Sequence, residues 1–213
     1  MTIGHGSTIE RLARWLRGST HRTNHGEFLW RSVWSESVVM QQIALDMLRS
    51  LHRKDAGPCY LILDETQTLK RGKKMAAVGK LFHHATGKYG TGHTILKVCL
   101  HYRGVTIPWA SWLWLKPADA RKQDVPFLKL TQLAALTIHN ADLPSTLQVT
   151  VLFDCYYLCD VVVDACRCRG WHFVSVGKGN RNFTVDGRKH ELDSYGRNIL
   201  RRKARWQRIG GLR

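Results

Sequence analysis

Residues 60–66 read Tyr-Leu-Ile-Leu-Asp-Glu-Thr, a short apolar run that ends in an acid. A second run of the same kind, Val-Thr-Val-Leu-Phe-Asp-Cys, occupies residues 149–155. Apolar runs of this length, rich in Leu, Ile and Val, are typical of buried strands. A carboxylate at the C-terminal tip of a buried strand adds nothing to packing. We therefore expect Asp64 and Asp154 to be functional residues that converge on a metal ion.

The net charge of the chain narrows the class of partner. The 213 residues include 33 Lys and Arg against 16 Asp and Glu, a formal net charge of +17. Nucleic acid is the usual partner of such a protein, because each phosphate that a basic side chain neutralises releases a counterion. A merely basic, soluble protein is the alternative. Eight Trp residues and two acidic strand ends argue against a ribosomal protein.

Length and hydropathy predict a single domain of ordinary size that is not inserted in a membrane. A hydrophobic fraction of 44% is sufficient for a core. The sequence has no 18-residue apolar span and no signal-peptide core at its N-terminus, so we expect a cytoplasmic protein. In that reducing compartment the six cysteines are predicted to be thiols and not disulfides.

Residues 1–56 are predicted to form an N-terminal helical segment. Ser7 or Thr8 can cap a first helix that ends at Gly18, and residues 19–26 are polar and turn-like. A second helix is predicted for residues 35–51, where apolar side chains recur at helical spacing. The arginines on the polar faces fit DNA contacts or an ordinary solvated surface.

Residues 57–178 are predicted to be the core, and they begin with strands. The predicted strands are 60–64, 75–83, 94–101 and 107–115. The last of these carries Trp109, Trp112 and Trp114. A base-stacking platform is one interpretation of these indoles, but a buried strand is favoured because indoles are large and fill cores.

The second half of the core alternates helices and strands. A helix capped by Asp124 is predicted to run to His139, before the strand that ends at Asp154. Another helix, stopped by Gly170, and a strand at 171–176 follow. This order predicts an α/β, ribonuclease-H-like fold, in which helices flank a mixed sheet and the first and fourth strands are neighbours. Asp64 and Asp154 are then expected a few ångströms apart.

Paired carboxylates on a basic protein indicate phosphoryl-transfer chemistry. Carboxylates held together repel one another unless a cation neutralises them, and hard oxygen ligands suit Mg²⁺ or Mn²⁺. Two such ions can clamp a phosphodiester between the attacking and leaving oxygens. A basic turn follows the first strand and can grip DNA phosphates, although a solvated hairpin tip is an equal alternative; its residues are Lys70, Arg71, Lys73 and Lys74.

Several of these motifs resemble a known family. Two stretches are similar to the core of bacterial insertion-sequence transposases. The first is Leu63-Asp64-Glu65-Thr66, followed by Lys70 and Gly72-Lys73-Lys74. The second is Phe153-Asp154-Cys155-Tyr156-Tyr157, which is followed by a helix and a Gly-Trp-His-Phe-Val strand. The resemblance, to the Asp-Asp-Glu type with a β-rich insertion, spans residues 8–208. It implies metal-dependent DNA cleavage and strand transfer, with Asp64 and Asp154 as catalytic metal ligands. It further implies a bacterial, nucleoid-associated protein and a homo-oligomer on DNA.

The resemblance also implies a third acid, a glutamate on a helix after the insertion. Residues 179–213 resemble only the start of that insertion, with a hairpin at 183–188 and a basic tail. We therefore expect a fragment that lacks the final glutamate, and a non-catalytic DNA-binding remnant is the second hypothesis. A stand-alone nuclease, the third hypothesis, would need Glu191, Asp160 or Asp164 at the metal.

Other candidate sites are weaker. Zinc ligation by neighbouring cysteines does not match the spacing of zinc knuckles, so buried and surface thiols are favoured; these residues are Cys155, Cys159, Cys166 and Cys168. Glu65 is expected to point to the opposite side of the strand from Asp64. No phosphate-binding glycine loop occurs, and we expect no ATP dependence.

Overall fold

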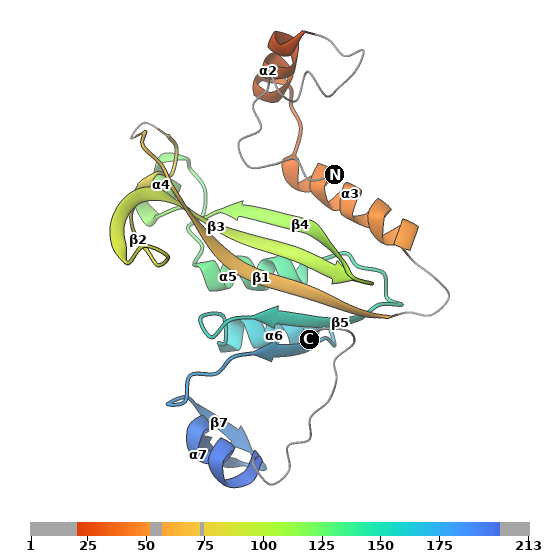
Figure 1. Ribbon diagram of the computed structural model, residues 1–213, viewed down its shortest axis with the longest axis vertical. Helices are drawn as coiled ribbons and strands as arrows, with labels where there is room; N and C mark the ends of the chain where they lie inside the picture. Colours follow the sequence, from red (N-terminus) through yellow and green to blue (C-terminus); the bar gives the residue numbers. More distant parts are fainter. Residues whose placement is uncertain (1–20, 52–56, 73–74, 201–213) are drawn as a thin grey trace. The chain divides into compact units, whose positions relative to one another are not determined.

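The computed structural model describes residues 21–51, 57–72 and 75–200 (Figure 1). The chain divides between Val39 and Met40 into two compact units. The helix predicted to end at Gly18 lies outside the described residues, as does the basic tail after residue 200. None of the helices in the described ranges is long and apolar enough to cross a bilayer.

The N-terminal part contains one predicted and one unpredicted helix. α3 (Glu36–Leu51) confirms the helix predicted for 35–51. The prediction of a turn at 19–26 is wrong from Arg22 onward, because α2 (Arg22–Arg31) begins there. The imidazole of His21 accepts a hydrogen bond from the Thr23 amide and caps α2. No apolar spacing in the sequence predicts this helix, and no residue of α2 is buried.

A mixed sheet forms the centre of the second unit and confirms the α/β, ribonuclease-H-like class. Its strands are β1 (Pro58–Leu69), β2 (Gly79–His83), β3 (Lys88–Tyr102), β4 (Val105–Leu113), β5 (Gln148–Phe153) and β6 (His172–Ser175). β4, β3 and β1 are antiparallel neighbours, and β5 and β6 continue the sheet in parallel with β1. The central position of β1 places Asp64, in the middle of this strand, beside the end of β5.

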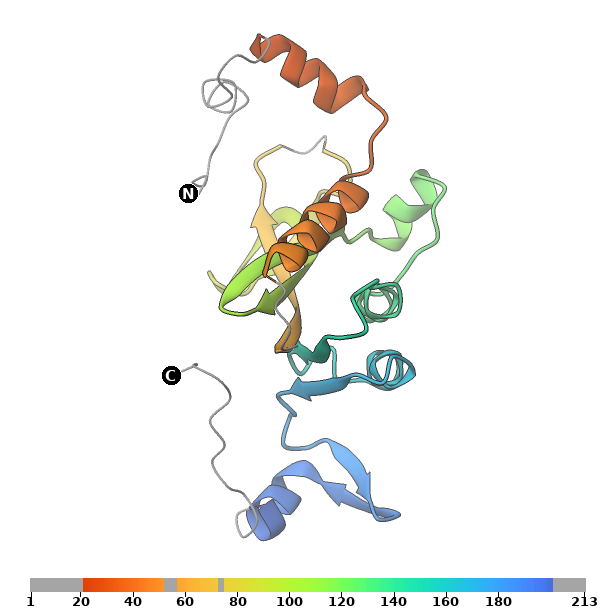
Figure 2. The same cartoon turned by 90° about the vertical axis from the view of Figure 1, so that its right-hand side faces the viewer.

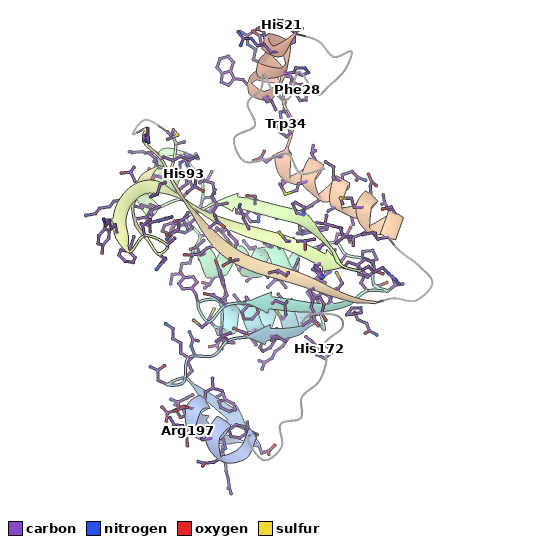
Figure 3. The ribbon with its side chains drawn as sticks, viewed as in Figure 1. His21, Phe28, Trp34, His93, His172 and Arg197 are labelled. Atoms are coloured by element: carbon purple, nitrogen blue, oxygen red, sulfur yellow. The ribbon has the colours of Figure 1, made fainter. Side chains whose placement is uncertain are left out.

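The predicted strand 75–83 is only half correct. β1 pairs directly with β3, and the short β2 pairs with the outer end of β3 alone. Residues 75–78 form a turn in which Ala77 has a positive φ of 58°. The His93 imidazole, labelled in Figure 3, holds this turn to β3 through a 2.8 Å hydrogen bond to the Ala76 carbonyl oxygen.

Three helices follow the antiparallel strands β1 to β4 along the chain: α4 (Pro117–Lys122), α5 (Leu130–His139) and α6 (Asp160–Cys168). Figure 2 shows α5 and α6 nearly end-on, side by side along the sheet. The prediction that Asp124 caps the second of these is wrong, because Asp124 has a positive φ of 51°. Pro126 keeps the residue before it out of the helical region, so α5 starts later. There the Gln132 side chain accepts a hydrogen bond from the Lys129 amide.

The core lies on one face of the sheet. On β1 the buried positions are Cys59, Leu61 and Leu63, which alternate with half-buried or exposed residues. The core cluster also contains their register partners on β3 and β5 and residues of α5 and α6. From α3 it contains Ala44 and Leu48. Burial of this face determines the register of the strands, and the register determines which residues are neighbours on adjacent strands.

The tryptophan run is part of this core, as predicted. Trp109 is 1% exposed and lies at a β-bulge of β4, opposite the step from Val98 to Cys99 on β3. Trp112 and Trp114 are half-buried and pack against the same cluster. The indole N–H of Trp114 donates to the Leu128 carbonyl oxygen. The base-stacking interpretation of these indoles is therefore set aside.

A small second sheet follows the core. β7 (Asn182–Val185) and β8 (Arg188–Glu191) form the predicted hairpin, with Asp186 and Gly187 at positive φ in its turn. α7 (Leu192–Tyr195) and the π-helical turn η1 (Gly196–Leu200) follow it. The hairpin is anchored to the core by Arg181, whose guanidinium donates to the carbonyl oxygens of Leu158 and Cys155.

Thiol burial gives a simple test of this packing. All six cysteines are free; Cys59 and Cys166 are buried and Cys168 is exposed. Burial raises the pKa of Cys59 and of Cys166 to about 11. Since the thiolate is the nucleophile, we expect iodoacetamide at pH 8 to label Cys168 within minutes and to spare the other two in the native state. Peptide mass spectrometry reads this; native labelling of Cys166 comparable with that of Cys168 would contradict it.

Candidate active site

The register of two strands brings Asp64 and Asp154 together. β1 and β5 are parallel, and their last register pair is Leu63 with Phe153. Asp64 and Asp154 each follow by one residue, and both are exposed. Neighbouring strands lie about 4.8 Å apart, and successive side chains alternate between faces. Asp64 therefore lies in the middle of β1 on the face opposite the core, and Asp154 lies one strand away, directly after the end of β5.

Asp154 is held by the loop that it begins. Its Oδ1 accepts a 2.9 Å hydrogen bond from the Tyr156 amide, and its carbonyl oxygen accepts one from the Tyr157 amide. The Ser175 hydroxyl at the end of β6 donates to the same carbonyl oxygen at 3.1 Å. Arg181 fixes the rest of the loop through Cys155 and Leu158, as described above. These contacts give Asp154 a defined position before any ligand binds.

Glu65 lies on the core side of β1, as alternation predicts. It pairs in register with the fully buried Leu96 and is itself half-buried. Burial raises the pKa of the Glu65 carboxyl; His84 lowers it in part, and the charges of Asp154 and Asp64 add to the rise. The Tyr157 hydroxyl is also buried, and it has no hydrogen-bond partner within the described residues. A half-buried acid and a buried phenol thus lie close enough to the aspartate pair to feel its charge.

The raised pKa of Glu65 predicts a pH-dependent stability. Between its unfolded and folded pKa values the native state binds more protons, so this acid destabilises the fold increasingly as pH rises through that interval. Glu65→Gln removes the charge and should raise the metal-free Tm at pH 7 by on the order of 1–2 °C. The gain should vanish below the unfolded pKa. Calorimetric scans across pH test this, and an equal gain at low pH would contradict it.

Sequence reasoning missed Lys97, the cross-strand neighbour of Asp64. The two residues are register partners on β1 and β3, so their side chains share one face. Ser111 of β4 is in turn the partner of Lys97. Lys97 is exposed and makes no ion pair within 4 Å in the described part of the chain. Only the pairing of β1 with β3 reveals it, since thirty-three positions separate the two residues along the chain.

A comparison of the sequence with protein families identifies the family of this chain. The family model described as DDE superfamily endonuclease matches residues 1–208. The chain belongs to the DDE superfamily of endonucleases. A search of curated proteins gave no match. Family membership gives DNA as the substrate class, nuclease-type chemistry and the use of divalent metal ions.

The aspartate pair of this DDE endonuclease suits a divalent metal ion. Mg²⁺ is bound in proteins through one or two carboxylates, with waters and substrate phosphates as its other ligands. Asp64 and Asp154 are exposed, adjacent and free of any basic residue within ion-pair distance in the described ranges. The chemistry and the placement of these oxygens fit such an ion.

The predicted third acids do not join the pair. Glu191 ends β8 in the separate two-stranded sheet, and Asp160 and Asp164 lie on α6, where Asp164 pairs with Arg167. Across residues 21–51, 57–72 and 75–200, no three His, Cys, Asp or Glu side chains are grouped to hold a metal ion. These residues include Cys155, Cys159, Cys166 and Cys168, which therefore form no such metal-binding group in the described ranges.

The basic turn lies further from Asp64 than the sequence implied. The predicted strand ends at Asp64, but β1 continues to Leu69, because its outer half still pairs with β3. At about 3.3 Å per residue, Lys70 follows Asp64 by roughly 20 Å along the strand. Lys70 and Arg71 lie at this end of β1, with the Lys70 amide bonded to the Thr91 carbonyl oxygen. Lys73 and Lys74 lie outside the described residues.

Proposed function

We propose that this DDE endonuclease is a DNA transposase that cuts DNA at the ends of a bacterial insertion sequence and transfers the freed strand. Residues 57–178 would be its catalytic core, with Asp64 and Asp154 as metal ligands and residues 179–213 as the start of a β-rich insertion. The single observation that carries this proposal is the register of β1 and β5, which makes the two aspartates neighbours. Oligomerisation on paired DNA ends and a nucleoid location belong to the same proposal.

The residues of the site have different roles in phosphodiester cleavage. A bound Mg²⁺ or Mn²⁺ ion would supply Lewis-acid polarisation of the phosphate and activation of water. Asp64 and Asp154 provide its anionic ligands, and the Tyr156 amide keeps the Asp154 carboxylate oriented. Lys97 offers a positive charge one strand away, where it can hold a non-bridging phosphate oxygen. The basic turn reaches phosphates roughly six base steps further along the DNA, at 3.4 Å per step.

The role of Lys97 has its own expected result. Lys97→Gln should reduce the affinity for duplex DNA and lower the magnitude of the salt slope, log K against log salt, by about 0.9, the value for one phosphate contact. Lys189→Gln on β8 removes the same charge from an exposed site on the separate sheet and serves as the matched control. Fluorescence anisotropy over a salt series measures both. Equal slopes for Lys97→Gln and the unmodified protein would remove Lys97 from the DNA contact.

A nicking assay with metal tests the catalytic proposal. Supercoiled plasmid and a duplex with insertion-sequence-type ends are incubated with the chain and Mn²⁺, Mg²⁺ or EDTA. Metal-dependent nicks that leave a 3′-OH support the proposal. Metal binding is read separately by calorimetry, and absence of both binding and nicking would refute it.

One observation favours a second function. Within the described residues no third carboxylate accompanies Asp64 and Asp154, and a two-carboxylate site binds metal weakly. A non-catalytic DNA-binding protein that occupies transposon ends would bind DNA with a steep salt dependence and show no nicking at any metal concentration. The same plasmid assay distinguishes the two functions.

A further inference from the structure

The hairpin of β2 and β3 carries exposed aromatic rings at its end. We name Phe82, His84 and Tyr89 the aromatic tip. Phe82 is 40% exposed and Tyr89 is 70% exposed, although both are large rings next to a well-packed sheet. Large rings at this exposure lose the burial that normally stabilises them. Their position therefore needs a reason other than the core.

The three rings are arranged in a fixed order. Phe82 and Tyr89 are register partners, with ring centroids 5.2 Å apart at 69°. Phe82 also meets His84 edge-on, at 5.4 Å and 82°. A cross-strand pair of this kind stabilises a hairpin. Stabilisation of the hairpin, however, does not account for the large fraction of Tyr89 that remains open to solvent.

The surroundings of the aromatic tip are cationic. Every charged side chain between Glu65 and Asp119 in the sequence is basic. The Lys80 ammonium lies over the Tyr89 ring, 4.8 Å from its centroid, and Lys88 follows on the next strand. Lys116 donates to the Lys80 carbonyl oxygen at 2.8 Å and thereby adds a further charge. Open rings among cations match the surfaces that bind single-stranded nucleic acid, and the carboxyl of Glu65, whose pKa His84 lowers, is an acid close to this tip.

The aromatic tip is tied to the strand that carries Asp64. The His84 amide donates a 3.3 Å hydrogen bond to Oε1 of Gln67 on β1. Gln67 follows Asp64 by three residues, which is about 10 Å along a strand. That distance corresponds to about three base steps of one DNA strand. This distance reaches Gln67 only; Tyr89 lies on β3 eight residues before Lys97, the register partner of Asp64, which is about 26 Å or roughly eight base steps along the strand.

We propose that the aromatic tip stacks an unpaired nucleobase of the DNA, within about eight nucleotides of the phosphate that Asp64 and Asp154 address. Tyr89 is the principal stacking surface, Phe82 and His84 hold it in place, and Lys80 and Lys88 contact the flanking phosphates. This inference deepens the proposed function and rests on DNA as its substrate. It predicts a preference for DNA that is frayed or open near the cleavage site.

Two DNA probes and three variants test the inference without any divalent metal. One probe is a duplex with a single unpaired 2-aminopurine near a frayed end, and the other is the same duplex fully paired. The variants are Tyr89→Ala, Tyr89→Phe and, as a matched control, Leu113→Ala, which truncates an exposed apolar residue of β4. Binding is read by anisotropy, stacking by quenching of 2-aminopurine, and folding by the Tm of each variant.

The expected result is a loss specific to the unpaired base. Tyr89→Ala should weaken binding of the frayed probe about tenfold and abolish the quenching, with less than a twofold effect on the paired probe. Tyr89→Phe and Leu113→Ala should behave as the unmodified protein does. Equal loss on both probes, no loss, or a Tyr89→Phe defect as large as that of Tyr89→Ala would overturn the inference. Because EDTA is present, none of these outcomes depends on whether the chain cleaves DNA.

Discussion

Asp64→Asn and Asp154→Asn should each reduce metal-dependent DNA cleavage by about a thousandfold or more. Loss of one anionic ligand removes several kcal/mol of stabilisation of the reacting phosphate, and each 1.4 kcal/mol is tenfold in rate. Asn keeps the size and shape of the side chain but not its charge. Both aspartates are exposed, so the fold should tolerate the change. Cleavage is followed on a labelled duplex under single-turnover conditions.

A second readout covers the case in which the chain alone cuts slowly. Calorimetric titration with Mn²⁺ should show binding weakened at least about tenfold by either substitution. Asp142→Asn is the matched control: Asp142 is exposed and precedes β5, at the strand end opposite Asp154. If Asp142→Asn affects metal binding as much as Asp154→Asn does, the assignment of the metal site to Asp64 and Asp154 is wrong.

Trp109→Ala should give the largest loss of stability. The indole is 1% exposed at the bulge where β4 pairs with β3, and truncation of a buried Trp costs about 3–5 kcal/mol. In a chain of this size that corresponds to a fall in Tm of roughly 10 °C. Because β4 supports β3, and β3 in turn holds β1, the active fraction should fall at 37 °C. Thermal unfolding measured by near-UV circular dichroism checks this.

Trp109→Phe separates packing from polarity at the same position. The Trp109 indole N–H is buried and has no hydrogen-bond partner among the described residues, so its removal relieves an unpaired donor. The smaller ring still fills most of the space. We expect its Tm to lie much closer to that of the unmodified protein than to that of Trp109→Ala. Equal losses for the two variants would mean that the indole nitrogen matters more than the ring volume.

Local pattern was sufficient to predict much of the fold. The apolar runs before Asp64 and Asp154 were predictable as strands because short runs rich in Leu, Ile and Val are typical of buried strands. The Asp-Gly hairpin was predictable because its turn needs two residues that tolerate positive φ. Errors arose where no such signal exists: α2 has no apolar face, and the outer half of β1 is polar and is maintained only by its pairing with β3.

Some residues of the candidate site were likewise predictable from the sequence, and others were not. Asp64 and Asp154 were identified from the sequence because an acid at the end of an apolar strand is chemically conspicuous. Lys97, Arg181 and the contact between Gln67 and His84 were not, because each depends on which segments pair or meet in space. None of these residues differs from an ordinary surface residue in its local sequence.

By itself, the sequence determined the class of the protein: a basic α/β chain with two acidic strand ends and a charge suited to DNA. Composition and periodicity decide these properties, since both are set by neighbours along the chain. Only the tertiary structure decided which side chains share the site. Register between strands is a long-range property, and it placed Lys97 beside Asp64; a hydrogen bond from the His84 amide to Gln67 tied the aromatic tip to the same strand.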